Sequence, residues 1–124
     1  MEVGRIIRGR MEKALPLPFG QCETLRFVGE AKEPSMQELA RHFKIAAPSA
    51  TSLVNELVRG GYVARSGNTR DRREVRLSLT RKGKQTLVSV VERRKKVLGT
   101  LLVSLAVRDH RDLNRILNKI LTDA

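Results

Sequence analysis

The chain has 124 residues, and its 25 Lys and Arg against 13 Asp and Glu give a formal net charge of +12. This length fits one domain, and 40% hydrophobic residues suffice for a core, which excludes a disordered basic tail. The charge favours a polyanionic partner, with nucleic acid as the first candidate and an anionic membrane surface as the second. No uncharged run exceeds 11 residues, whereas a transmembrane helix needs about 20, so we expect no membrane span.

The N-terminal segment carries Glu2 and Arg5 without an apolar signal core, so we expect a cytoplasmic rather than a secreted protein. Cys22 is the only cysteine, which excludes an internal disulfide and a multi-cysteine zinc site. We expect this thiol to pack in a core rather than act as a redox switch, because its apolar helix offers no clear way to lower its pKa. His42 and His110 lie on different predicted elements, so no metal site is expected.

Two helices are predicted in the first third of the chain, both with apolar residues at helical spacing. The first covers residues 1–15, and Pro16 and Pro18 end it, because proline lacks a backbone N–H and restricts its predecessor. The second runs from about Phe19 to Ala31, and Pro34 ends the connection that follows.

The next segment begins with a capping box, Ser35-Met36-Gln37-Glu38. The serine oxygen is expected to accept from the N3 amide while Glu38 reaches back, and the helix is expected to end near Lys44. After a tight turn, Pro48 stands at the predicted first position of a second helix, where its missing N–H costs nothing. This second helix ends at the pair Gly60-Gly61, and four of its residues are expected to face inward: Thr51, Val54, Leu57 and Val58. Two short helices joined in this way form a helix-turn-helix.

Beyond Gly60-Gly61 the apolar residues no longer recur at helical spacing but alternate with polar ones. Residues 62–65 and 74–79 predict two strands, joined by a segment rich in turn formers and arginine. A helix-turn-helix followed by such a hairpin is a winged helix. Residues 65–84 hold eight basic and two acidic side chains, so charge concentrates here and indicates a contact surface. Arg65 and Arg76, at the base of the hairpin, are expected to add to this field rather than to make specific contacts.

The last third predicts a long helix and a shorter one. Thr80 is expected to cap the long helix, which runs from about Arg81 toward Leu105 and would measure about 40 Å. Asp109 or Asp112 is expected to begin the last helix. The apolar stripe of these helices is too extensive for so small a core, so we expect it to be buried across a two-fold interface. The candidate interface residues lie on both helices: Leu98, Leu102, Leu113, Ile116, Leu117, Ile120 and Leu121.

The stretch from Met36 to Gly83 resembles the MarR family of bacterial and archaeal transcriptional regulators. Its most specific part is the wing signature, in which Asp71-x-Arg73 precedes a strand that ends in Leu79-Thr80-x-x-Gly83. The resemblance implies a homodimer in which the terminal helices of two chains intertwine and two winged helices bind a palindromic operator. It also implies that a small lipophilic or phenolic effector, or an oxidant, acts between the dimer helices and the DNA-binding lobes.

The predicted fold is therefore mainly α with a small β-hairpin wing, organised as one domain over residues 1–124. A winged helix-turn-helix DNA-binding lobe covers residues 19–84. Dimerisation helices flank it at residues 1–18 and 85–124.

The candidate DNA-binding residues fall into two groups. Those of the recognition helix are expected to contact bases or phosphates in the major groove, with the inward-facing threonine skimming the groove: Pro48, Ser49, Thr51, Ser52 and Asn55. In the wing, the resemblance makes Arg73 the arginine that enters the minor groove and Asp71 the residue that orients it. Arg70 and Arg72 are expected to contact phosphates.

We expect a sequence-specific regulator of transcription, most often a repressor, whose partners are double-stranded DNA and a second copy of the chain. No cofactor and no enzymatic activity are expected, since nothing resembles a nucleophile elbow, a phosphate loop or a pair of catalytic carboxylates. One alternative is a non-specific or architectural DNA-binding protein without ligand control. Another is a winged helix used for protein or RNA contacts, against which the wing signature argues.

Overall fold

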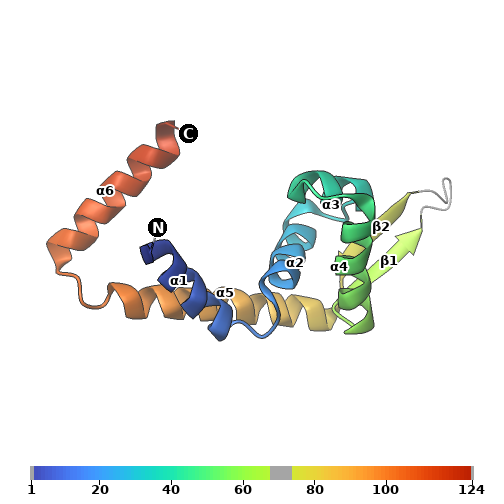
Figure 1. Cartoon of the computed structure of the whole chain (residues 1–124), viewed down its shortest axis with the longest axis horizontal. Coiled ribbons are helices and arrows are strands. Elements are labelled where there is room, and N and C mark those ends of the chain that lie inside the picture. The colour runs from blue at the N-terminus through green and yellow to red at the C-terminus, as the bar shows by residue number, and fades with distance from the viewer. Residues whose placement is uncertain (1, 68–73, 124) are drawn as a thin grey trace.

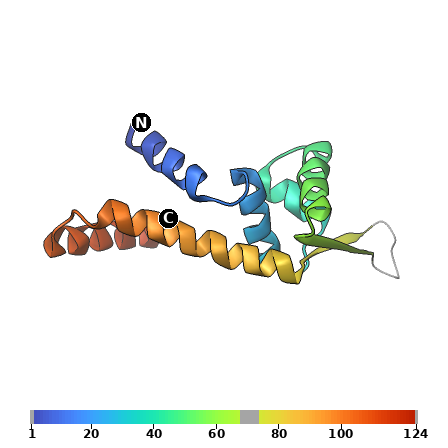
Figure 2. The same cartoon turned by 90° about the horizontal axis from the view of Figure 1, so that it is seen from below.

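The computed structural model describes residues 2–67 and 74–123. A long helix, α5 (Arg81–Leu102), runs along the longest axis of the molecule, with a winged-helix lobe at one end (Figure 1). Helix α1 (Glu2–Ala14) packs along α5 toward its other end, and α6 (Val107–Asp123) leaves that end, so both termini lie far from the wing. The view from below shows the hairpin pointing away from α1 and α6 (Figure 2).

The winged-helix lobe consists of three helices and a two-stranded antiparallel hairpin: α2 (Phe19–Ala31), α3 (Met36–Phe43), α4 (Ala47–Arg59), β1 (Val63–Gly67) and β2 (Val75–Leu79). Each of these elements contributes buried side chains to the core of the lobe. The fully buried leucines come from α2, α3, α4 and β2: Leu25, Leu39, Leu57 and Leu77. Burial of each such side chain stabilises the fold by about 1.5–3 kcal/mol. The predicted fold class and the order of its elements are confirmed.

Helix α3 has half of the predicted capping box. Ser35 Oγ accepts from the N–H of Glu38 at 3.1 Å, as expected. The prediction that Glu38 reaches back to cap the helix is wrong, because its carboxylate instead accepts from Arg76 Nη1 at 3.3 Å. The helix ends where Lys44 adopts a left-handed backbone conformation, with φ of 54°. Pro48 stands one position later than predicted, because α4 already begins at Ala47.

The hairpin pairs Val63 with Leu79 and Arg65 with Leu77, so these four side chains share one face of the sheet. Val63 and Leu77 are buried in the core of the lobe. The connection between α2 and α3 extends the sheet locally, since Leu77 N–H donates to the carbonyl of Pro34 at 2.9 Å. Strand β2 is thus attached at its middle to the connection between α2 and α3.

The start of α5 is joined tightly to the turn after α4. Thr80 Oγ1 accepts from the N–H of Gly83 at 3.0 Å, which confirms the predicted cap, and donates to the carbonyl of Gly61 at 2.6 Å. Thr80 N–H donates to the carbonyl of Tyr62, and Lys82 Nζ donates to that of Gly60 at 2.7 Å. This joint, made by residues 60–62 and 80–83, connects the end of α4 to the start of α5.

A second, smaller core ties α2 to α5 and to the end of α1. It consists of Leu15, Cys22 and Val90. Beside it, Arg94 of α5 forms an ion pair with Glu23 of α2 at 2.6 Å, with only about a fifth of each side chain exposed. These contacts position the winged-helix lobe on α5.

The last two helices differ from prediction in their ends. Helix α5 stops at Leu102 rather than near Leu105, and α6 begins at Val107 rather than at Asp109 or Asp112. The reason is that Asp109 Oδ2 accepts from the N–H of Ala106 at 3.1 Å, so this carboxylate caps the helix from its third residue.

Candidate nucleic-acid interface

The outer face of α4 carries the five residues predicted for the recognition helix, and all five are exposed: Pro48, Ser49, Thr51, Ser52 and Asn55. The prediction that Thr51 faces inward is wrong. Ala50 takes the inward position instead, together with Val54 and Leu57, and the Thr51 hydroxyl donates to the carbonyl of Ala47 at 3.0 Å. The one carboxylate of α4 is that of Glu56, one turn beyond Ser52, and it is paired with Arg59 at 3.0 Å.

Asn55 lies at the edge of this face, next to the wing. Its amide Oδ1 accepts a hydrogen bond from Nη2 of Arg65 in β1. Arg65 thus makes a specific contact within the chain, between α4 and the hairpin, and its expected contribution to the surrounding field stays a prediction. The strand period could have revealed this contact, because Arg65 is two residues beyond buried Val63 and therefore shares its inward face.

The four predicted wing residues, Arg70, Asp71, Arg72 and Arg73, lie outside the described residues. Their roles at the minor groove and at phosphates stay predictions.

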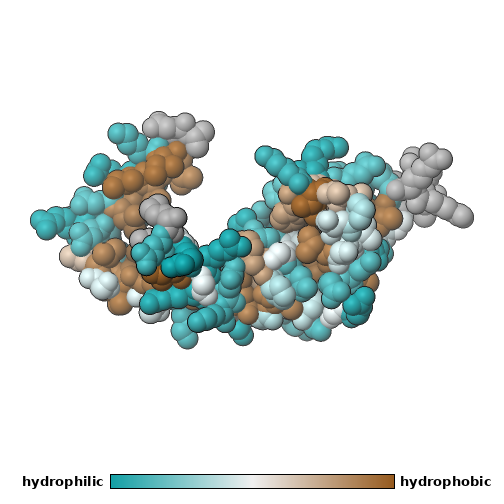
Figure 3. All heavy atoms as spheres, in the orientation of Figure 1, coloured by the Kyte–Doolittle hydropathy of each residue, from teal (hydrophilic) through white to brown (hydrophobic). Residues whose placement is uncertain are grey.

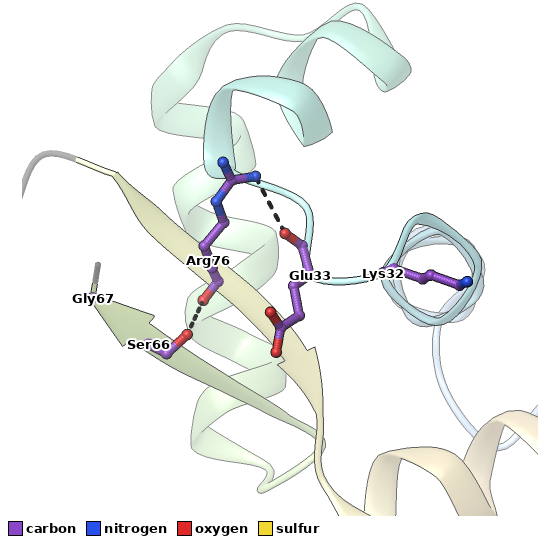
Figure 4. Close-up of a pocket in the computed structure, with 5 residues that line it drawn as sticks. All are labelled: Lys32, Glu33, Ser66, Gly67 and Arg76. Carbon is purple, nitrogen blue, oxygen red and sulfur yellow. Dashed lines mark hydrogen bonds between the residues drawn. The ribbon is translucent and has the colours of Figure 1, made fainter. Parts of the chain in front are cut away.

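Arg76 anchors the other side of the hairpin to the helices. It forms ion pairs with Glu38 at 3.3 Å and with Glu74 at 3.0 Å, and its Nη1 also donates to the backbone carbonyl of Glu33 at 3.4 Å. These are specific contacts, which the sequence did not predict. Figure 4 shows how this arginine extends from β2 across to the connection between α2 and α3. Its charge is balanced by two carboxylates, so Arg76 is a structural tie rather than a free cation.

Two pockets flank the connection between α2 and α3. The first, of about 430 Å³, is polar and is lined by Lys32, Glu33, Ser66, Gly67 and Arg76 (Figure 4). The second, of about 500 Å³, lies between α2, β2 and α5. Its apolar lining comes from Val28, Leu79, Leu87 and Val88. Its charged lining consists of Lys32 and Glu33, which follow α2, and Lys84 of α5.

The Cys22 thiol and the His42 imidazole both contact neighbouring groups of the chain. Cys22 is buried, its Sγ donates to the carbonyl of Leu17 at 3.4 Å, and burial raises the pKa of its thiol. The His42 ring stacks on Phe27 with the ring centroids 4.3 Å apart. Within residues 2–67 and 74–123, no three His, Cys, Asp or Glu side chains gather as metal ligands would.

The residues predicted for a dimer interface lie on the surface of this single chain. Helix α6 packs against no other described helix or strand as closely as α1 packs on α5. Its apolar side chains are open to solvent, with Leu117 45% and Leu121 73% exposed, and Leu98 of α5 is 43% exposed. Figure 3 shows this apolar surface running along α6. None of the helices in the described part of the chain has the length and apolarity needed to cross a membrane.

Comparison with known proteins agrees with this geometry. The model of the MarR family matches residues 15–74, which span α2 to the start of β2. The structure superposes on the YusO protein from Bacillus subtilis with a TM-score of 0.88 and 22% identity, over 99% of this chain and 89% of that one.

Two of the similar solved structures hold nucleic acid. A mutant of S. aureus MepR bound to an oligodeoxyribonucleotide has a TM-score of 0.76 and 16% identity, over 98% of this chain and 92% of that one. Streptococcus pneumoniae FabT in complex with DNA has a TM-score of 0.69 and 20% identity, over 86% and 75%. No curated protein matches the sequence significantly.

Proposed function

The chain belongs to the MarR family, and from that premise we propose that it is a homodimeric regulator of transcription that binds a palindromic site on double-stranded DNA. The observation that carries this proposal is the exposed polar face of α4 at Ser49, Ser52 and Asn55, joined by the Asn55–Arg65 hydrogen bond to a hairpin whose sequence is rich in arginine. The DNA-bound structures of similar fold support the same use of this lobe.

In the proposed complex, the N-terminal turns of α4 enter the major groove. Small polar side chains there, such as Ser49 and Ser52, suit contacts to base edges or phosphates, and Pro48 packs against the groove wall. The wing arginines Arg70, Arg72 and Arg73 would reach the backbone and the adjacent minor groove, with Asp71 orienting Arg73. Each phosphate neutralised in this way makes binding more sensitive to salt.

The homodimer follows from the exposed apolar stripe of α6. A helix of 17 residues that packs only weakly on the rest of the described chain is marginal in water, and its apolar face needs to be covered. A second copy of the chain offers the same face, which is how a two-fold interface forms. We therefore propose that Leu98 and Leu102 of α5 and the α6 stripe bury one another across the dimer: Leu113, Ile116, Leu117, Ile120 and Leu121.

A small effector is the third part of the proposal. The pocket between α2, β2 and α5 has apolar lining and two lysines, Lys32 and Lys84, against one carboxylate, that of Glu33, so its net positive charge suits a lipophilic or phenolic anion. A ligand there would press on the contact between the winged-helix lobe and the long helix, and release from DNA would make the protein a repressor. We propose no catalytic activity for this chain.

The decisive experiment selects duplexes from a randomised library with the full-length protein at near-physiological salt. Recovery of a palindrome of about 16–20 base pairs supports a specific dimeric regulator, because half-sites about one helical turn apart mirror the protein symmetry. No enrichment, with binding that fades steeply as salt rises, would instead identify the non-specific DNA-binding protein considered above.

The dimer is tested by sedimentation of the same protein. The expected mass is twice the 14.0 kDa of the chain, and replacing Leu117 and Ile120 together by Glu should halve it. A wild-type protein that stays at the mass of one chain at micromolar concentration would refute the dimer.

A further inference from the structure

We propose that Asn55 is a positioning residue, whose neutral amide holds the Arg65 guanidinium at the junction of the recognition helix and the wing, where its uncancelled charge binds a DNA phosphate. The inference rests on the proposed function, since it assumes that duplex DNA docks on this lobe. The observation behind it is the hydrogen bond from Arg65 to Asn55, which joins β1 to α4.

The position of Arg65 in the hairpin directs its side chain toward α4. Arg65 pairs with Leu77, which is buried, so both side chains leave the sheet on the face that covers the core. An arginine at such a position keeps its charged end in water by extending its stem along neighbouring apolar surface. Asn55 receives the guanidinium there, one turn beyond Ser52 on the exposed face of α4.

The charge of the partner distinguishes the two arginines at the base of the hairpin. Arg76 is paired with two carboxylates, those of Glu38 and Glu74, so its charge is cancelled locally. Within the described residues, Arg65 has no carboxylate at ion-pair distance, and the side chain to which it donates is an uncharged amide. Arg65 is therefore held in place by Asn55, and no carboxylate among residues 2–67 and 74–123 cancels its charge on the proposed DNA-binding face.

Glu56, the acidic residue of α4, does not cancel the charge of Arg65. Glu56 follows Asn55 directly, but it accepts from Arg59 at 3.0 Å, one turn farther along the helix. A guanidinium has five N–H donors, and the bond to Asn55 uses one nitrogen, so others remain for a phosphate oxygen. Because an arginine that is already held loses less freedom on binding, the amide should raise affinity without touching DNA itself.

Four variants separate positioning from charge and from base recognition. Asn55→Ala keeps the charge but removes the holding bond, whereas Asn55→Asp keeps the bond but cancels the charge. Arg65→Gln removes the charge, and the double variant Asn55→Ala with Arg65→Gln tests whether the two residues act together. Arg59→Gln is the control, because it removes an arginine charge of α4 that is already paired with a carboxylate, that of Glu56.

The affinity of each variant is measured for the duplex selected by the wild-type protein, as a function of salt. Arg65→Gln and Asn55→Asp should each lower affinity about tenfold and reduce the salt slope by about 0.9 for each phosphate that is no longer neutralised. Asn55→Ala should lower affinity about threefold to tenfold with its salt slope and base preferences unchanged. The double variant should bind no more weakly than Arg65→Gln alone, and Arg59→Gln should keep the salt slope of the wild type.

The opposite results are equally clear. If Asn55 reads a base itself, Asn55→Ala will change the preferred base at one position of each half-site, and its loss of affinity will multiply with that of Arg65→Gln. An Arg59→Gln variant as weak as Arg65→Gln would show that only overall charge matters. Either result overturns this inference alone, whereas a wild-type protein that binds no duplex overturns the proposed function as well.

Discussion

Replacement of Gly83 by Ala should destabilise the protein strongly, although alanine normally favours a helix. A β-carbon at this position would lie 3.0 Å from the carbonyl carbon of Tyr62 and closer still to its oxygen. Ordinary contacts between carbon atoms are about 3.5–4.0 Å, and backbone cannot rotate away as a side chain can. The start of α5 would have to move by about 0.5–1 Å or more, which strains the hydrogen bonds of Thr80 and Lys82 to residues 60–62.

The expected size of this effect comes from three contributions. Overpacking costs about 1–3 kcal/mol, and each hydrogen bond weakened at the joint costs about 1 kcal/mol. The greater helix propensity of alanine offsets about 1 kcal/mol. With the three hydrogen bonds of Thr80 and Lys82 weakened, the free energy of unfolding should fall by about 3–5 kcal/mol, which corresponds to a decrease in Tm of about 10–20 °C for a domain of this size.

Circular dichroism at 222 nm, at one protein concentration, measures this change. The near-ultraviolet signal reports on the joint specifically, since Tyr62 is the only tyrosine and the chain has no tryptophan. Gly20→Ala is the matched control, because the added methyl group would lie 3.6 Å from Leu53, an ordinary contact. A Gly83→Ala protein whose Tm equals or exceeds that of Gly20→Ala would refute the reasoning.

Three further predictions concern the contacts that hold the lobe on α5. Thr80→Ala should lower the free energy of unfolding by about 1–2 kcal/mol in denaturant titration, because it removes a helix cap, whereas Thr80→Ser should lower it far less. Cys22 should react with a thiol reagent only after denaturation. Burial raises the pKa of this thiol in the folded state, so its contribution to the free energy of unfolding should be fully present below the ordinary thiol pKa of about 8.5. That free energy should decline as pH rises above this value, and Cys22→Ala should abolish the decline. Arg94→Met should lower Tm by a few degrees, since partly buried Glu23 then keeps only the more exposed Arg26 at 3.2 Å, and an unchanged Tm would show that the Arg94 ion pair adds nothing.

Much of the fold could be predicted because its signals are local. The bounds of α2 follow from the prolines around it, and the caps at Ser35 and Thr80 depend on residues only three positions away. The helical spacing points Thr51 inward, but the smaller Ala50 is the residue that fits against the core, a choice that depends on how closely α3 approaches.

The contacts that the sequence did not predict join residues far apart in the chain. Glu38 could form a capping box, but its carboxylate instead pairs with Arg76, which stands 38 residues later in the chain. The charge pattern makes Arg65 part of a general field, although the two-residue period of its strand already places it on the inward face. Partner choice of this kind depends on three-dimensional approach, which spacing along one element does not determine.

The rigid joint between α4 and α5 has a consequence for register on DNA. The lobe is fixed to the first turn of a helix of 22 residues, which measures about 33 Å. A tilt of α5 by about 6° around its far end moves the lobe by about 3.5 Å, and successive base pairs are about 3.4 Å apart. A change in helix direction too small to break contacts at the far end would thus displace the recognition helix by one step along the double helix.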